Sequence, residues 1–226
     1  MFRVAALSLL FALPSLAATP DAGKKPRIAV LYFEGLTKDE DVQVLAKGYA
    51  ELLINDLLAT GAMDVIERTR LEEIITELKL GESRFANKES FAKVGDILGA
   101  DFLVTGSFIN IGKNKYLITP RLKIVRTSLF VKLKNVVLDA NDVLEGEQGL
   151  VAEMAAALRN EDTLKDLQPP PKRGHTLSLD ATMKYSKALD AKDKKDKATQ
   201  KKLLTEVLQA QPEFKLAQAD LLTLRD

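Results

Sequence analysis

The stretch Val94–Ser107 decides the fold class, and it reads Val-Gly-Asp-Ile-Leu-Gly-Ala-Asp-Phe-Leu-Val-Thr-Gly-Ser. Val94 and Leu98 fall at helical spacing, so a helix ends in this stretch. Gly99 suits the left-handed residue that closes a helix, where a Cβ would be strained. The apolar run 102–104 follows without a polar break, which indicates a strand covered on both faces. A helix that leads directly into a buried strand is typical of an α/β domain.

Upstream of this stretch, strand-like and helical segments alternate. Arg27–Phe33 is a continuous apolar run of strand length, and a short strand is predicted at Met63–Ile66. Helices are predicted at Asp39–Thr60, over the amphipathic pattern Leu71–Leu78, and at Asn87–Leu98. Because strand–helix–strand order implies a crossover connection, we expect parallel pairing in this half of the sheet.

Downstream, the pattern changes to the period of strands. Strands are predicted at Asp101–Ile111, Tyr116–Arg126 and Leu129–Leu138, and the short turns between them make an antiparallel meander. Pro120 cannot donate a backbone hydrogen bond, so we expect it at an open edge or in a bulge. A further helix is predicted at Leu150–Leu158. The expected fold class is α/β (α+β): a mixed sheet of about five strands with packed helices, plus a small all-α C-terminal hairpin.

The clearest boundary in the chain is the charged segment Arg159–His175, which contains Pro169-Pro170-Pro171, a stiff extended spacer. Beyond it, helices are predicted at Ala181–Ala191, Ala198–Gln209 and Leu216–Leu224. The expected division is a signal peptide at 1–17, an α/β domain at 26–158, a linker at 159–175 and a helical segment at 176–226.

The first residues have the parts of an export signal in the right order. Arg3 is the charged start, Val4–Leu13 is the apolar run, and Ser15-Leu16-Ala17 offers small residues for cleavage. The apolar run is too short to span a bilayer, which takes about 20 residues. We expect cleavage after Ala17, with Ala18 as the alternative, and a periplasmic protein if the source is Gram-negative. A buried N-terminal helix is the other interpretation.

Composition excludes several classes of site. The 226 residues carry a net charge of +1, which gives no general electrostatic reason for nucleic-acid binding. The absence of cysteine rules out disulfides, thiolate nucleophiles, cysteine metal sites and a lipid on an N-terminal cysteine. Phosphate-cradling glycine loops and the Gly-x-Ser-x-Gly and His-Glu-x-x-His motifs do not occur. We therefore expect no catalytic residue, cofactor, metal, small-molecule substrate or membrane span in the mature chain.

Four features deserve a functional interpretation beside a structural one. His175 is the single histidine, and a linker residue in water explains it better than a metal site or a triad. The carboxylates of Glu72-Glu73 and Asp39-Glu40-Asp41 suit acid–base work, but helix starts favour negative charge as well. The lysine-rich run Lys192–Lys202 lacks aromatic residues for stacking on bases. It indicates a solvated helix face and connector, with an anionic surface as the alternative partner.

Three blocks of sequence together resemble the curli-assembly CsgG family. They are Ile28–Glu34, Asp64–Arg68 with Leu71, and Leu98–Ser107, in the family's order and rough spacing. This broad superfamily is similar to the TolB N-terminal domain and to LpoB-type activators of penicillin-binding proteins. The resemblance covers about Pro26 to Leu158. It implies an α/β domain with a mixed sheet, an envelope location, and a role in assembly or scaffolding rather than catalysis.

The chain departs from the secretion channel of that family. It lacks a lipid-anchoring cysteine and shows no extra amphipathic hairpins for a membrane barrel, so a soluble periplasmic relative fits better. The C-terminal segment is similar to a degenerate tetratricopeptide repeat, with Ala188, Leu204 and Pro212 at matching positions. A plain charged helical hairpin is the alternative. We expect this hairpin to dock on the α/β domain or to pair with a partner.

The sequence therefore predicts a non-enzymatic interaction or assembly protein of the cell envelope, which binds a protein partner or itself. One alternative is a ring-forming subunit of an envelope secretion or motility apparatus, and oligomer size separates the two. A second alternative, from another class, is a hydrolase with an unfamiliar site. That alternative requires a pocket with convergent polar groups.

Overall fold

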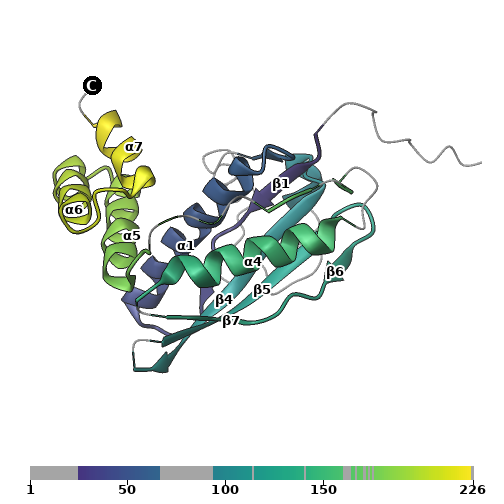
Figure 1. Ribbon diagram of the computed structural model, residues 1–226, viewed down its shortest axis with the longest axis horizontal. Helices are drawn as coiled ribbons and strands as arrows, with labels where there is room; N and C mark the ends of the chain where they lie inside the picture. The colour runs from purple at the N-terminus through teal and green to yellow at the C-terminus, as the bar shows by residue number, and fades with distance from the viewer. Residues whose placement is uncertain are drawn as a thin grey trace, which may run out of the picture.

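A computed structural model describes residues 25–66, 94–113, 115–139, 141–159, 164–165, 167–169, 172, 174 and 176–224. The predicted signal peptide, the predicted helix Leu71–Leu78, the Glu72-Glu73 pair and His175 lie outside these residues. The described chain forms one mixed sheet with helices packed on it and a group of three helices at one end (Figure 1).

The sheet contains both parallel and antiparallel pairs, as the sequence predicts. Its order is β3-β1-β4-β5-β6, with β2 beside β4 and β7 beside β5. β1 pairs in parallel with β3 and β4, and β4 pairs antiparallel with β5. The strands are β1 (Arg27–Val30), β2 (Glu34–Gly35), β3 (Asp64–Val65), β4 (Phe102–Gly112), β5 (Lys115–Ile124), β6 (Leu129–Val131) and β7 (Val136–Leu138).

The stretch that predicts the fold class lies at the centre of this sheet. Residues 94–98 are helical, and Gly99 ends the turn with φ at +60°, which confirms the left-handed cap. β4 follows directly and pairs with β1 on one side and β5 on the other. Leu103 and Val104 are completely buried on opposite faces, so this strand is covered on both sides at its N-terminal end.

Two predicted strands are shortened or interrupted. Of the run Arg27–Phe33, only Arg27–Val30 forms a strand, β1, and β2 begins just after the run, at Glu34. The predicted strand Leu129–Leu138 divides into β6 and β7, because Pro120 of β5 lies opposite the break. Along an antiparallel pair, the backbone groups of successive residues point alternately toward the partner strand and away from it. The Val125 N–H donates to the Asp101 carbonyl just before β4. Pro120, five residues earlier, therefore points its nitrogen away from β4 and toward this break. Proline has no N–H to offer a neighbouring strand there.

The break also contains a bulge. Ile118 pairs with Val136 and Leu122 pairs with Val131, so residues 132–135 lie opposite only residues 119–121. A helix that packs on the sheet supplies a hydrogen-bond acceptor for the backbone of the bulge. The Lys134 N–H donates to Glu153 Oε1 at 3.0 Å and to Oε2 at 3.1 Å. Pro120 therefore faces a bulge in the neighbouring segment, in the interior of the sheet rather than at its open edge.

We predict that Glu153→Ala lowers the free energy of unfolding by about 1 kcal/mol, because it removes a charged acceptor from the Lys134 N–H. Urea denaturation monitored by circular dichroism measures the change. Glu145→Ala is the control, since Glu145 is an exposed carboxylate in the same helix. Equal stability of the two variants would contradict this role of Glu153.

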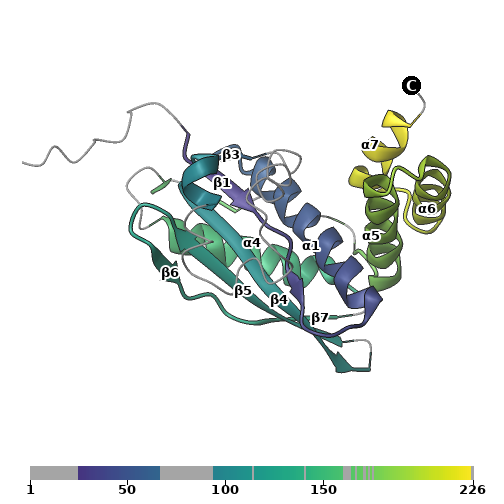
Figure 2. The ribbon, with the colours of Figure 1, turned by 180° about the vertical axis from the view of Figure 1, so that it is seen from behind.

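Two long helices cover one face of the sheet (Figures 1 and 2). They are α1 (Glu40–Ala59) and α4 (Val143–Leu158), and Asp39 and Asp142 cap their N-termini by accepting from backbone N–H groups. α4 starts seven residues before the predicted Leu150. Gly146 lies in this first part, where a Cβ would come within 2.9 Å of a Val136 methyl carbon. The glycine lets α4 approach β7 closely but weakens the helical signal in the sequence.

The C-terminal helices are α5 (Leu179–Asp193), α6 (Lys197–Ala210) and α7 (Lys215–Thr223). α5 packs against α1, so the predicted hairpin docks on the sheet-bearing part of the chain. Gly48 of α1 touches Ser186 of α5, and Lys47 pairs with Asp190 at 2.8 Å. The apolar core continues from the sheet through α1 to Phe214 beside α7. The division of the chain into domains stays a prediction.

Candidate interaction surface

The structure gives the predicted acidic and basic runs structural roles. Asp39 caps α1 through the Asp41 N–H at 3.0 Å, and Asp41 forms an ion pair with Lys187 at 2.8 Å. In the run Lys192–Lys202, Asp196 caps α6 by accepting from the Thr199 N–H at 3.0 Å. No group of His, Cys, Asp or Glu side chains suited to a metal ion occurs in the part of the chain that is described.

The strongest candidate for a binding surface is the face of the sheet that α1 and α4 do not cover. Side chains at even positions of β4 and β5 point to the face that α1 and α4 cover. Side chains at odd positions point the other way, and near the start of β4 they pack with Val94 and Leu98. Toward the β4–β5 turn, the same face is open to solvent. Figure 2 shows the sheet from this side.

Four apolar side chains form a straight row across this open face. Leu117 of β5 lies opposite both Ile109 of β4 and Val137 of β7. Leu36 continues the row on the other side of β4, because its N–H donates to the Phe108 carbonyl at 2.8 Å. Leu36 is 56% exposed and Val137 is 51% exposed, while the two central side chains are half-buried. We call these four residues the cross-strand row.

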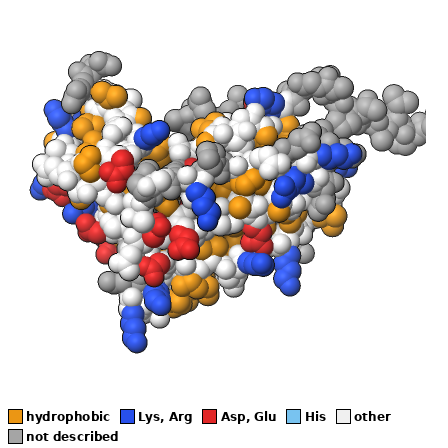
Figure 3. Space-filling model, in the orientation of Figure 1, with side chains coloured by type: hydrophobic (Ala, Val, Ile, Leu, Met, Phe, Trp, Pro, Cys, Tyr) orange, Lys and Arg blue, Asp and Glu red, His pale blue; other side chains and the backbone are white. Residues whose placement is uncertain are grey.

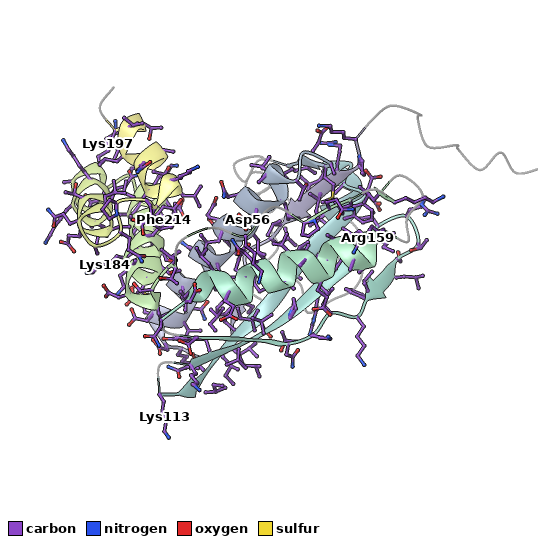
Figure 4. The ribbon with its side chains drawn as sticks, in the orientation of Figure 1. Asp56, Lys113, Arg159, Lys184, Lys197 and Phe214 are labelled. Atoms are coloured by element: carbon purple, nitrogen blue, oxygen red, sulfur yellow. The ribbon has the colours of Figure 1, made fainter. Side chains whose placement is uncertain are left out.

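The charges around the cross-strand row have both signs. Lys115 and Asp139 lie two residues along their strands from Leu117 and Val137, and both are exposed. On the other side, Glu34 is paired in register with Ser107. Lys113 projects from the β4–β5 turn, away from the body of the protein (Figure 4). Acidic and basic side chains are also interspersed on the opposite face of the molecule (Figure 3).

The sequence did not predict the cross-strand row. Apolar residues at odd positions of β4 and β5 are visible in the sequence, but they indicate only that both faces of the strands carry apolar side chains. Which of them become neighbours depends on the register between β4, β5 and β7. Leu36 has no strand pattern at all, since it follows the two residues of β2.

Comparison with known protein families finds a match in the first half of the chain. The family described as Curli production assembly/transport component CsgG matches residues 10–116. Over these residues the chain is similar to the CsgG family. The matched span begins before the expected Pro26 and ends at Tyr116 in β5, short of the expected Leu158. It includes β4, which follows Gly99 in the most specific of the three sequence blocks.

Solved structures that resemble part of this chain come from several bacteria. The LpoB C-terminal domain from Salmonella enterica is 16% identical, with a TM-score of 0.43, and the match covers 53% of this chain and 87% of that one. Lipoprotein GNA1162 from Neisseria meningitidis is 16% identical, with a TM-score of 0.43, over 60% of this chain and 98% of that one. TolB from Acinetobacter baumannii is 14% identical, with a TM-score of 0.41, over 61% of this chain and 29% of TolB. Likenesses of this size assign no function.

No curated protein matches the chain. The tetratricopeptide-like character of the C-terminal helices has no match among the families found and stays a prediction. Among the described helices, none combines the length and the apolar character that crossing a bilayer requires.

Proposed function

We propose that this chain is an exported, non-enzymatic protein of the cell envelope that works in interaction or assembly through its CsgG-like domain. The observation that carries the proposal is the cross-strand row, because solvent-facing apolar side chains in a row indicate a contact surface. Residues 1–17 contain the parts of an export signal in the right sequence order, and this supports an envelope location together with the CsgG-like match.

The partner that fits the cross-strand row best is a second copy of this chain. A straight row of similar apolar side chains is self-complementary, since a rotation of 180° brings apolar groups onto apolar groups. The flanking charges Lys115, Asp139 and Glu34 have both signs, so they do not select a partner of one charge. The net charge of +1 also leaves little repulsion between copies.

The size of the row sets the expected affinity. Stable interfaces bury roughly 800 Å² on each partner, and four side chains alone do not supply this area. The polar residues on both sides, including Ser107 and Thr119, must take part as a hydrogen-bonding rim. We therefore expect dimers that form at micromolar concentration. A shared patch on both copies closes at two subunits, which favours a dimer over the ring considered from the sequence.

We predict that Val137→Lys weakens dimerisation of the mature chain at least tenfold, because it places a charge in the apolar row, which is desolvated when two copies meet. Sedimentation velocity over a concentration series measures the dissociation constant. Leu222→Lys is the matched control: Leu222 is 59% exposed but lies on α7, away from the row. A monomeric wild type at high micromolar concentration, or an equal effect of both substitutions, would contradict self-association.

A photocrosslinking residue placed at position 137 in the cell tests the same surface without purification. A crosslinked product of this chain with itself supports the second copy as the partner. A product with one different envelope protein keeps the role in interaction but replaces that partner. No crosslink from position 137, with the same result at Leu36 and Ile109, would overturn the cross-strand row as the contact surface.

A further inference from the structure

One carboxyl group is completely buried in the core. Glu147 lies in the second turn of α4 and has no exposed surface. Neither its Oε1 nor its Oε2 accepts a hydrogen bond from any described residue. A carboxylate left without hydrogen bonds in an apolar core is strongly disfavoured, so this group is retained there only at a cost to stability.

Among the described residues, the elements packed on α4 bring no cation to Glu147. α1 contributes Tyr49, whose buried hydroxyl also has no partner among the described residues, and, two turns further on, Asp56. β7 contributes the apolar side chains of Val136 and Leu138, because Val137 points to the open face of the sheet. Other ionisable groups interact elsewhere. Glu153 accepts from the Lys134 N–H, and the pKa of Tyr116 in β5 is raised by burial and then by the negative charges of Asp39 and Asp41. Burial raises the pKa of Glu147 to about 8.

Tyr49 of α1 lies in the same buried environment as Glu147. Its pKa is raised well above the ordinary value, first by burial and then by the negative charge of Glu147. Tyr49 itself is held in place by Phe33 and Phe108, whose ring centroids lie 5.6 Å and 5.2 Å from its own. The tyrosine therefore cannot turn away to admit water while α1 stays packed on the sheet.

We propose that Glu147 is a proton-dependent latch, which lets α4 pack on α1 and β7 while the carboxyl group is protonated and loosens the helix when the proton is lost. When α4 opens, water reaches the carboxyl group and its pKa returns toward the ordinary value of 4.5. The closed state therefore binds the proton more tightly. Stability from this group is fully present below pH 4.5 and falls as the pH rises to about 8.

Amide hydrogen exchange, resolved by residue on the whole mature chain, tests the latch between pH 5 and pH 8. After correction for intrinsic exchange, protection factors in α4 should fall by up to tenfold per pH unit, since opening releases one proton. Protection in α6 should not follow this slope. Glu147→Gln should abolish the slope in α4, because glutamine has the same shape and does not titrate. Glu145→Gln, on the exposed side of α4, should leave it unchanged.

Two results would overturn the latch: α4 protection in the wild type that is independent of pH, or a slope that survives in Glu147→Gln. If that variant does not fold, carbon NMR of the Glu147 carboxyl group in the wild type decides. A midpoint near pH 8 supports the proposal, and a midpoint near pH 4.5 rejects it. The result is independent of whether the cross-strand row binds a second copy.

Discussion

Gly106→Ala is expected to lower the free energy of unfolding by about 3 kcal/mol, the high end of the usual cost of overpacking a core. An added Cβ would overlap two ring carbons of Phe33 and lie 2.7 Å from the Thr119 carbonyl oxygen. Phe33 has no room to move, because its ring packs edge-on against both Tyr49 and Phe108. The carbonyl oxygen belongs to the β4–β5 ladder and is equally fixed.

Urea denaturation measures this loss, and Gly149→Ala provides the matched control. Gly149 lies in α4, and a Cβ there would meet nothing within 4 Å. The same substitution should therefore stabilise the protein by about 0.5–1 kcal/mol through helix propensity alone. A Gly106→Ala variant as stable as the wild type would show that Gly106 is not required by close packing.

Gly48→Ala is the second substitution with a large expected effect, because it pushes α5 away from α1. A Cβ at this position would overlap the Ser186 hydroxyl oxygen and lie 2.9 Å from the Ser186 Cβ. That hydroxyl is fully buried and donates to the Thr182 carbonyl at 2.7 Å. We expect a loss of about 2 kcal/mol, although alanine normally stabilises a helix interior relative to glycine.

A double-mutant cycle with Ser186→Gly separates the clash from helix propensity. Removing the Ser186 side chain makes room for the new methyl group, so the double variant should be about 1–2 kcal/mol more stable than the sum of the single changes predicts. Denaturation curves of the four proteins give this coupling energy. Additive effects would mean that α1 and α5 are not in close contact at these two residues.

Local sequence predicts the elements of this fold well where one residue type has a specific conformational role. Gly99 marks the left-handed helix end, Asp39 marks the start of α1, and Pro120 marks a position of β5 that has no strand partner on the side away from β4. In each case the signal depends on the residue itself and its immediate neighbours. The mixed sheet follows from the order of these elements along the chain.

The parts that could not be predicted depend on contacts between distant segments. The division of residues 129–138 into two strands follows from Pro120 on the neighbouring strand, not from their own alternation. Glu147 looks like an ordinary polar residue of a helix, and its burial becomes evident only when α1 and β7 pack around it. The cross-strand row likewise depends on the register between β4, β5 and β7 and on the position of the loop residue Leu36.

The break between β6 and β7 has a consequence for how copies of this protein meet. An uninterrupted outer strand is a template on which further strands add without limit, the first step toward fibres. Here the outer edge of the sheet offers two strands of three residues each, separated by a bulge that carries Lys132 and Lys134 and that the Glu153 carboxylate occupies. Addition of strands at this edge is thereby disfavoured. The contact that we propose between two copies uses the open face of the sheet, so it does not require this edge to be a template for strands.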